Sequence, residues 1–162
     1  MSVSPYQAPD KPTEVSVEFE AGVPVAVNGE KMKVSAIIKK LNALGGANGI
    51  GILDIVENRL IGMKDHGIYE TPGGTILYFA HEQLEMLTLD KETSHLKSKL
   101  AVDYADLIYN GKWYTPLQEA LTAFAKKANE HCTGTVKLKL YKGNMINAGI
   151  TSPYSQYSEE LV

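Results

Sequence analysis

Alternation of apolar and polar residues at both ends of the chain is the feature that most restricts its fold. Residues 15–19 alternate in this way near the start, and residues 136–140 do so near the end. A period of two is typical of a strand with one buried face. Each segment continues into a second apolar stretch, after Ala21-Gly22 in the first case and Gly143-Asn144 in the second. The sequence therefore predicts a β-hairpin at each end.

Between these hairpins the apolar residues recur every three or four positions, which is typical of helices. We expect four helices. The first is capped by Ser35 and ends at Gly45-Gly46, and the second starts at Thr71-Pro72. The third ends at Asn110-Gly111, and the fourth starts with the capping box at Thr115. The predicted fold class is α+β, an antiparallel or mixed β-sheet with hairpins at both ends and a central set of helices packed on it.

Two further segments complete the predicted organisation. Residues 1–12 hold three prolines and predict an extended arm, not a packed element, ahead of a domain that spans residues 13–162. Residues 50–56 are a nearly continuous apolar run, which predicts a buried strand that ends at residues 57–59.

Composition excludes several classes of function. The chain has 162 residues, the length of one ordinary domain, and its formal net charge of −3 argues against a nucleic-acid binder. No apolar run approaches the roughly 20 residues of a membrane span, and the first residues do not resemble a secretory signal. Cys132 is the only cysteine, so no internal disulfide can form. We expect a soluble, cytoplasmic protein.

Three motif-like segments predict little chemistry. The glycines of residues 45–51 resemble a phosphate cradle, but the predicted helix precedes them and the strand follows, which is the reverse of a nucleotide-binding loop. The segment from His81 to Glu85 begins like a zinc-protease helix but has no second histidine, so we expect no metal site there. Cys132 directly follows His131, and neighbours in sequence rarely form a nucleophile–base pair. We expect no catalytic residue in this chain.

The densest polar segment lies between residues 54 and 75. Glu57 and Arg59 end the predicted strand, and Tyr69 and Glu70 directly precede a helix start, whose free amides favour an anion. A carboxylate for an ammonium and donors for a carboxylate would suit a free amino acid. The alternative is a surface ion pair beside tightly packed glycines. The residues alone leave both interpretations open.

The same residues resemble the argininosuccinate synthase family over the whole chain. The stretches that carry the resemblance are Asp54-Ile55-Val56-Glu57-Asn58-Arg59, Gly67-Ile68-Tyr69-Glu70-Thr71-Pro72-Gly73-Gly74-Thr75, Tyr104-Ala105-Asp106-Leu107-Ile108-Tyr109-Asn110-Gly111, Ser152-Pro153-Tyr154-Ser155 and Glu159-Glu160-Leu161. In that family this region is the second, catalytic and multimerisation domain, and residues 1–12 resemble the connector from a nucleotide-binding domain. That first domain and the family's C-terminal helix have no counterpart in this sequence.

The resemblance implies a function for the complete enzyme. The family joins citrulline to aspartate with ATP and Mg, through a citrullyl-adenylate, and releases pyrophosphate and AMP. It implies that Glu57 binds the citrulline α-ammonium and that the Tyr69 hydroxyl hydrogen-bonds its polar head. ATP would bind mainly to the absent domain, and no cofactor would be held tightly here. The implied partners are citrulline, the nucleotide-binding domain and further copies of the chain in a homotetramer.

The sequence also departs from the family pattern. Ile52, His66 and Ile150 stand where most members carry arginine, and Arg59 is the only arginine in the chain. This lowers the number of interdomain and intersubunit salt bridges that we expect. The isolated chain should be catalytically silent, and the alternative is a non-catalytic amino-acid-binding or oligomerisation module that retains the fold.

Overall fold

The computed structural model describes residues 1–158, so the last resemblance motif, at residues 159–161, lies outside the described residues. The strands are β1 (Thr13–Glu20), β2 (Val23–Val27), β3 (Glu30–Lys31), β4 (Ile52–Asn58), β5 (Lys64–Glu70), β6 (Gly134–Tyr141) and β7 (Asn144–Thr151). The helices are α1 (Val34–Ala47), α2 (Pro72–Thr88), α3 (Lys91–Tyr109) and α4 (Pro116–Ala128), with a 3₁₀ turn at Pro5–Gln7.

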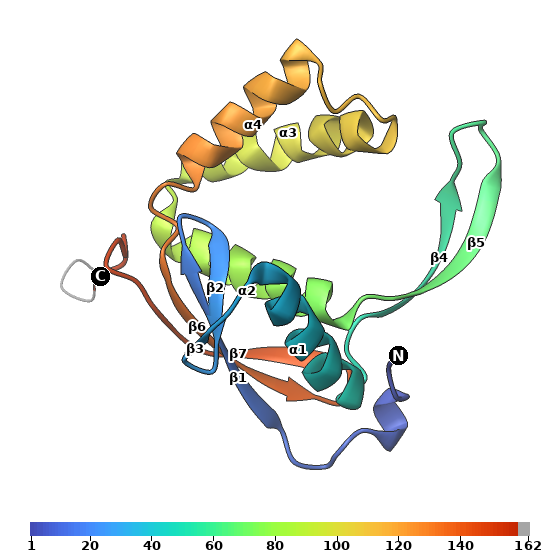
Figure 1. Ribbon diagram of the computed structural model, residues 1–162, viewed down its shortest axis with the longest axis vertical. Coiled ribbons are helices and arrows are strands. Elements are labelled where there is room, and N and C mark those ends of the chain that lie inside the picture. Colours follow the sequence, from blue (N-terminus) through green and yellow to red (C-terminus); the bar gives the residue numbers. More distant parts are fainter. Residues whose placement is uncertain (159–162) are drawn as a thin grey trace.

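The two terminal hairpins form one antiparallel sheet in the order β3-β2-β1-β6-β7 (Figure 1). They are joined by pairing of β1 with β6, in a register that places Glu14 opposite Lys139. Opposite charges that face each other across two strands stabilise this register on the exposed face. Both predicted hairpins and the α+β class are therefore confirmed.

The hairpin turns have the backbone conformation that the flanking strands require. Ala21 and Gly22 have φ values of 47° and 80°, and Lys142 and Gly143 have values of 46° and 83°. Two successive residues with positive φ match the right-handed twist of a hairpin. The second turn lies one residue earlier than Gly143-Asn144, because Asn144 already pairs with Tyr141.

The core lies between the sheet and helices α1 and α2, which cover one face (Figure 1). Its apolar members alternate along the strands and recur along the helices, as the periodicity predicts. They are Val15, Val17, Phe19, Val27, Ile37, Leu41, Ile50, Ile76, Ala80, Leu84, Cys132, Val136, Leu138 and Leu140.

Helix α1 differs from the prediction at both ends. It begins at Val34 after Lys33, so Ser35 is inside the helix and does not cap it. It also continues through Gly45 to Ala47. A Cβ on Gly45 would lie 2.8 Å from Ile76 Cδ1 and 2.9 Å from the Pro72 Cβ. The glycine is therefore used for the close crossing of α1 and α2, and it does not end the helix.

Helices α3 and α4 form a pair that projects from the body (Figure 1). The predicted cap of α4 is confirmed, because the Thr115 hydroxyl accepts a hydrogen bond from the Gln118 amide at 3.4 Å. Asn110 and Gly111 follow the end of α3 as expected. No residue of α3 is buried, and among the described residues its extensive contacts are with α4.

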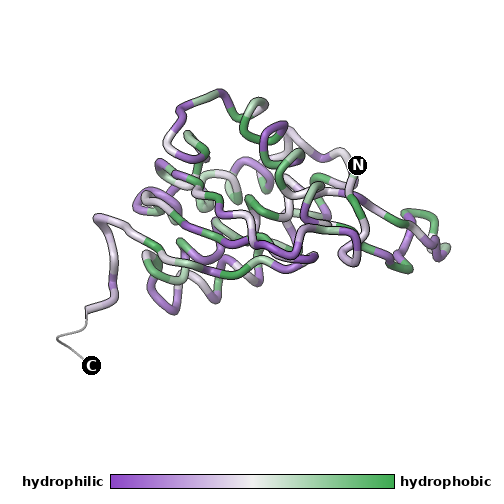
Figure 2. The backbone as a smooth tube through the Cα atoms, turned by 90° about the horizontal axis from the view of Figure 1, so that it is seen from below, coloured by the Kyte–Doolittle hydropathy of each residue, from purple (hydrophilic) through white to green (hydrophobic). Residues whose placement is uncertain are grey.

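The prediction of a buried strand at residues 50–56 is wrong. Ile50 is buried, but β4 begins at Ile52 and forms a separate two-stranded sheet with β5, which projects from the body (Figure 1). Val56 and Ile68 are each 67% exposed. An apolar run does not reveal whether other elements cover it. Figure 2 shows hydrophobic segments that extend into this projection, on the right of the view.

The first twelve residues contact the domain. The Val3 amide donates a hydrogen bond to the Gly46 carbonyl at 2.9 Å, and Ala8 is buried. The expected extended arm did not include these contacts with the rest of the fold.

Within residues 1–158, helices that combine the length and the apolar character needed to cross a membrane are absent.

Candidate functional site

The β4–β5 hairpin brings the two predicted substrate-binding residues onto one face. Glu57 pairs with Asp65 across the hairpin, and Tyr69 pairs with Leu53. Directly opposite residues share a face and alternate residues return to it, so Glu57, Asp65, Gly67 and Tyr69 lie on the same side. The predicted pair is therefore near in space although twelve residues separate it in sequence.

Gly67 allows Tyr69 to reach Glu57. The Tyr69 hydroxyl donates a hydrogen bond to Glu57 Oε1 at 2.5 Å, although its own backbone lies four positions nearer the base of the hairpin. The ring reaches that far by lying over Gly67, where an added Cβ would be 2.7 Å from Tyr69 Cε2 and 2.9 Å from its hydroxyl oxygen. A side chain at position 67 would occupy the volume of the ring.

Arg59 completes a polar cluster on this face. One of its guanidinium nitrogens lies 3.8 Å from Glu57 Oε1, and the other forms an ion pair with Asp65. Hydrogen bonding and attraction to Asp65 raise the pKa of Arg59, so it remains a cation. The hydrogen bond to Glu57 raises the pKa of Tyr69, so the phenol remains a donor at neutral pH.

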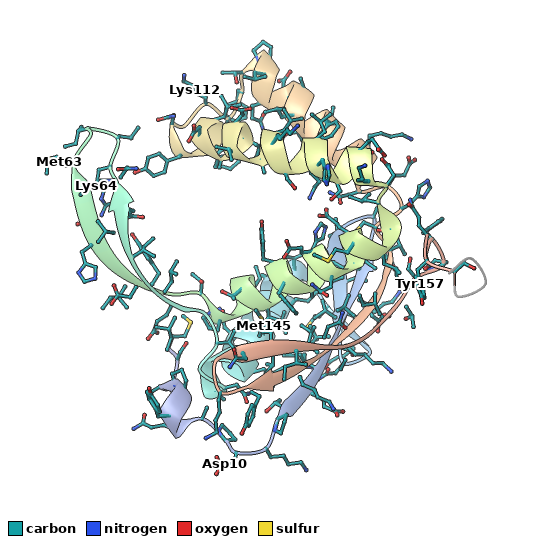
Figure 3. All side chains as sticks on the ribbon, turned by 180° about the vertical axis from the view of Figure 1, so that it is seen from behind. Asp10, Met63, Lys64, Lys112, Met145 and Tyr157 are labelled. Atoms are coloured by element: carbon teal, nitrogen blue, oxygen red, sulfur yellow. The ribbon has the colours of Figure 1, made fainter. Side chains whose placement is uncertain are left out.

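A groove lies between the end of the hairpin and the helical pair, and Arg59 is the member of the cluster that lines it. Asn58, Arg59 and Leu60 line one wall, and the other wall is lined by the end of α3 and the residue after it, namely Tyr104, Ala105, Asp106, Ile108, Tyr109 and Asn110. Figure 3 shows the two projections, with Met63 and Lys64 at the end of the hairpin and Lys112 at the end of the helical pair. Two of the motifs that carry the family resemblance therefore face each other across one groove.

Ile52, His66 and Ile150, where the resemblance led us to expect arginine, make ordinary contacts. His66 lies on the opposite face of the hairpin, with its Nε2 2.5 Å from Asp54 Oδ1. Ile150 packs against the core, and Ile52 is partly exposed at the base of the hairpin. Of the three, His66 retains a polar contact that an arginine could also make.

The start of α2 is not brought near Glu57. Asp65, opposite Glu57, is seven residues before Pro72, which corresponds to about 23 Å along a strand. The Gly73 amide already donates to Asn42 Oδ1 at 2.8 Å, and Glu70 accepts from the Ser2 amide at 3.2 Å. The helix start and Glu57 therefore cannot hold the two ends of one α-amino-acid group, which the residues alone had suggested.

The glycine-rich segment 45–51 is used for packing. Gly49 has a φ of +70°, and a Cβ there would lie 3.0 Å from the Pro5 backbone. Gly51 has a φ of +77°, and a Cβ added there would lie 2.7 Å from the Pro72 backbone. The segment contains the end of α1 and the connection to β4, so the helix comes before the strand, which is the order that argues against a phosphate cradle.

The sequence interpretation missed three parts of this site. It did not predict β5, because the turn at residues 59–63 carries no Asn-Gly or Asp-Gly signal. It therefore could not place Asp65 opposite Glu57, or assign a role to Gly67. A usable signal is present in retrospect, since a glycine two residues before an aromatic in a strand leaves the aromatic room on the same face.

Fold and site together define an α+β domain that displays its polar cluster on a projecting hairpin and does not enclose it. The sequence profile of the arginosuccinate synthase C-terminal domain matches residues 1–162. The chain is 58% identical over 161 residues to the argininosuccinate synthase of Desulforamulus reducens, and 60% identical over 158 residues to that of Moorella thermoacetica. These alignments cover 99% and 98% of this chain.

The chain belongs to the argininosuccinate synthase family, the ligases of arginine biosynthesis. It spans about two fifths of the length of these relatives, 40% for the first and 39% for the second. The same holds for the enzyme of Carboxydothermus hydrogenoformans, which is 61% identical over 157 residues. The family named from the sequence motifs is therefore confirmed.

Proposed function

We propose that this chain supplies the citrulline-binding hairpin and a subunit interface of an argininosuccinate synthase. In this proposal Glu57 accepts a hydrogen bond from the citrulline α-ammonium, and the Tyr69 hydroxyl contacts the polar head of the substrate. The observation that carries it is the contact between these two side chains on an accessible face. Family membership, shown over the whole chain, supports the substrate class.

The chemistry of the cluster suits an amino-acid ammonium. A carboxylate has about four acceptor sites, and Tyr69 uses one of those of Glu57. The Glu57 side chain keeps 29% of its surface exposed, so a ligand can reach it. Arg59 is held by Asp65, so it leaves the charge of Glu57 largely available. Charge-assisted hydrogen bonds of this kind are the stronger class in proteins.

ATP and aspartate would bind mainly to the part of the relatives that this chain does not span. Glycines 45–51 are engaged in packing and Arg59 is engaged by Asp65, so neither offers a phosphate site. We infer that the chain acts with a nucleotide-binding domain of the same enzyme and that the ligation requires both. In isolation the chain should not release pyrophosphate.

A specific observation also favours the second candidate, an oligomerisation module. The projecting hairpin exposes large apolar side chains, among them Ile61 at 79% and Val56 at 67%. Patches of this kind mark surfaces that bind protein. Within the complete enzyme the two roles are compatible. Further copies of the chain could cover the hairpin face that carries Val56, while the opposite face, which carries Glu57 and Tyr69, holds citrulline.

Calorimetric titration with citrulline tests the proposal. The chain would be mixed with the nucleotide-binding domain of a relative, and citrulline affinity and pyrophosphate release would be measured. Glu57→Gln should weaken citrulline binding about tenfold or more, because a charge-assisted bond becomes a neutral one. Asp54→Asn, on the opposite face of the same hairpin, is the matched control and should leave affinity unchanged. Unaltered binding in Glu57→Gln would overturn the assignment.

A further inference from the structure

A cluster of three potential metal ligands lies outside the hairpin site. His81 and Glu85 are one turn apart on α2, and Cys132 lies between α4 and β6. One ligand atom from each residue falls within 4.8 Å of the others. The sequence predicts no metal site here, because the helical motif has Glu85 in place of its second histidine. The fold brings Cys132 to these two residues as a third potential ligand.

The spacing of His81 Nε2 and Cys132 Sγ suits one tetrahedral ion, and Glu85 lies close by. His81 Nε2 lies 3.8 Å from Cys132 Sγ, and His81 Nδ1 lies 3.4 Å from Glu85 Oε1. Bonds of 2.0–2.3 Å to a tetrahedral zinc ion place neighbouring ligands about 3.3–3.8 Å apart. Because Nδ1 and Nε2 of one imidazole cannot bind the same ion, an ion held by Nε2 and Sγ requires the Glu85 carboxylate to turn from Nδ1 toward Nε2.

The surroundings leave polar atoms without suitable partners. Within residues 1–158, Glu85 Oε1 and Asn129 Oδ1 are buried oxygens that make no hydrogen bond. Asn129 borders the same space, because a Cβ on Gly22 would lie 3.1 Å from Asn129 Cγ and 3.2 Å from His81 Nε2. A buried acceptor without a donor, such as the Asn129 oxygen, is costly, and a cation would offset that cost, whereas Glu85 Oε1 already has the Lys97 ammonium beside it.

Lys97 is the competing explanation for this negative charge. Its ammonium lies 2.5 Å from Glu85 Oε1, although not in hydrogen-bond geometry. The Lys97 side chain is 27% exposed and borders the cavity between α2 and α3. Because this side chain is long and partly solvated, it can withdraw into that cavity when an ion approaches.

We propose that His81, Glu85 and Cys132 bind a single thiophilic divalent cation, of which Zn²⁺ fits the donor set best. Thiolate, imidazole and carboxylate together select zinc over the alkaline-earth ions. On binding, the thiol loses its proton to solvent and a sulfur–metal bond forms, with no change of oxidation state. The fourth position faces the cavity, which His81 and Glu85 line, and would hold water. The ion would tie α2 to the segment that precedes β6.

Cobalt(II) titration of the 162-residue chain tests this proposal, with Co²⁺ as the spectroscopic substitute for zinc. We expect a thiolate-to-cobalt charge-transfer band in the near ultraviolet that saturates at one equivalent and disappears when Zn²⁺ is added. Cys132→Ser should abolish the band. His131→Asn is the matched control and should retain it, because the His131 ring packs against Tyr154 instead.

Two further variants keep the test decisive if Cys132→Ser perturbs the fold. Glu85→Gln should weaken cobalt binding, and Lys97→Met should tighten it about tenfold, because it removes a cation a few ångströms from the ion. Lys99→Met, on the same helix and exposed, controls for the change of composition. The absence of a band at a large excess of Co²⁺, a band that survives Cys132→Ser, or weaker binding in Lys97→Met would each overturn the proposal and leave a Lys97–Glu85 ion pair as the whole role of the cluster.

Discussion

Replacement of Gly67 by alanine should separate Tyr69 from Glu57 without harm to the strand. The new Cβ would lie 2.7 Å from Tyr69 Cε2, whereas ordinary van der Waals contact begins at 3.4 Å, so the ring must retreat by about 0.7 Å. The hydroxyl oxygen, at 2.9 Å from the same Cβ, must also move. Such a shift would lengthen the hydrogen bond of 2.5 Å to about 3.2 Å, beyond the usual range for O–H···O bonds, unless Glu57 follows the ring.

The backbone should tolerate the change. Gly67 is not among the glycines with a positive φ, so alanine can adopt its conformation. Alanine also loses less conformational entropy on folding than glycine. We therefore expect unchanged or slightly higher stability to urea, together with a loss of citrulline affinity of about tenfold in the mixed enzyme. Binding would fall because the Tyr69 hydroxyl is no longer held in place.

Two readouts separate this mechanism from a general loss of structure. By NMR, the pKa of Tyr69 should fall back toward 10, because the Glu57 hydrogen bond that raises it is gone. In the Tyr69→Phe background, Gly67→Ala should cost no further affinity, because both changes remove the same contact. Gly74→Ala is the matched control, since a Cβ there meets nothing within 4 Å. Citrulline affinity equal to that of the parent in Gly67→Ala would refute the reasoning.

Three other outcomes follow from the fold. Thr115→Ala removes the cap of α4 and should lower the free energy of unfolding by about 1 kcal/mol in urea denaturation, and a loss indistinguishable from zero would contradict the assigned cap. Gly45→Ala should destabilise the protein by about 1–3 kcal/mol through overpacking against α2, whereas a neutral effect would show that the helices can separate freely. Burial raises the pKa of the Cys132 thiol to about 11 and shields its sulfur from reagents. Iodoacetamide at pH 8 should therefore label Cys132 only as fast as the protein unfolds, and rapid labelling of the native protein would disprove its burial.

The local signals predicted the body of the fold well. Alternation at residues 15–27 and 136–150 identified both hairpins, and the Thr115 capping box placed the start of α4. These features depend on residues near one another in sequence. Gly45 was misassigned because a glycine that ends a helix and a glycine that allows two helices to cross are identical in sequence.

The candidate site was predicted only in part. The pair Glu57 and Tyr69 was named from motifs, but its geometry depends on the register of β4 with β5, which no turn signal specified. The exposure of Val56 could not be predicted either, because burial depends on what other elements leave uncovered. The grouping of His81 with Cys132 joins residues 51 positions apart, and only tertiary structure could supply it.

Citrulline titration of the chain mixed with a relative's nucleotide-binding domain tests the central claim most directly. The account predicts saturable binding that weakens about tenfold or more in Glu57→Gln, stays unchanged in Asp54→Asn, and is accompanied by pyrophosphate release once ATP and aspartate are added. Binding of equal strength in the parent and in Glu57→Gln would contradict it, and citrulline would then have to be held by other residues.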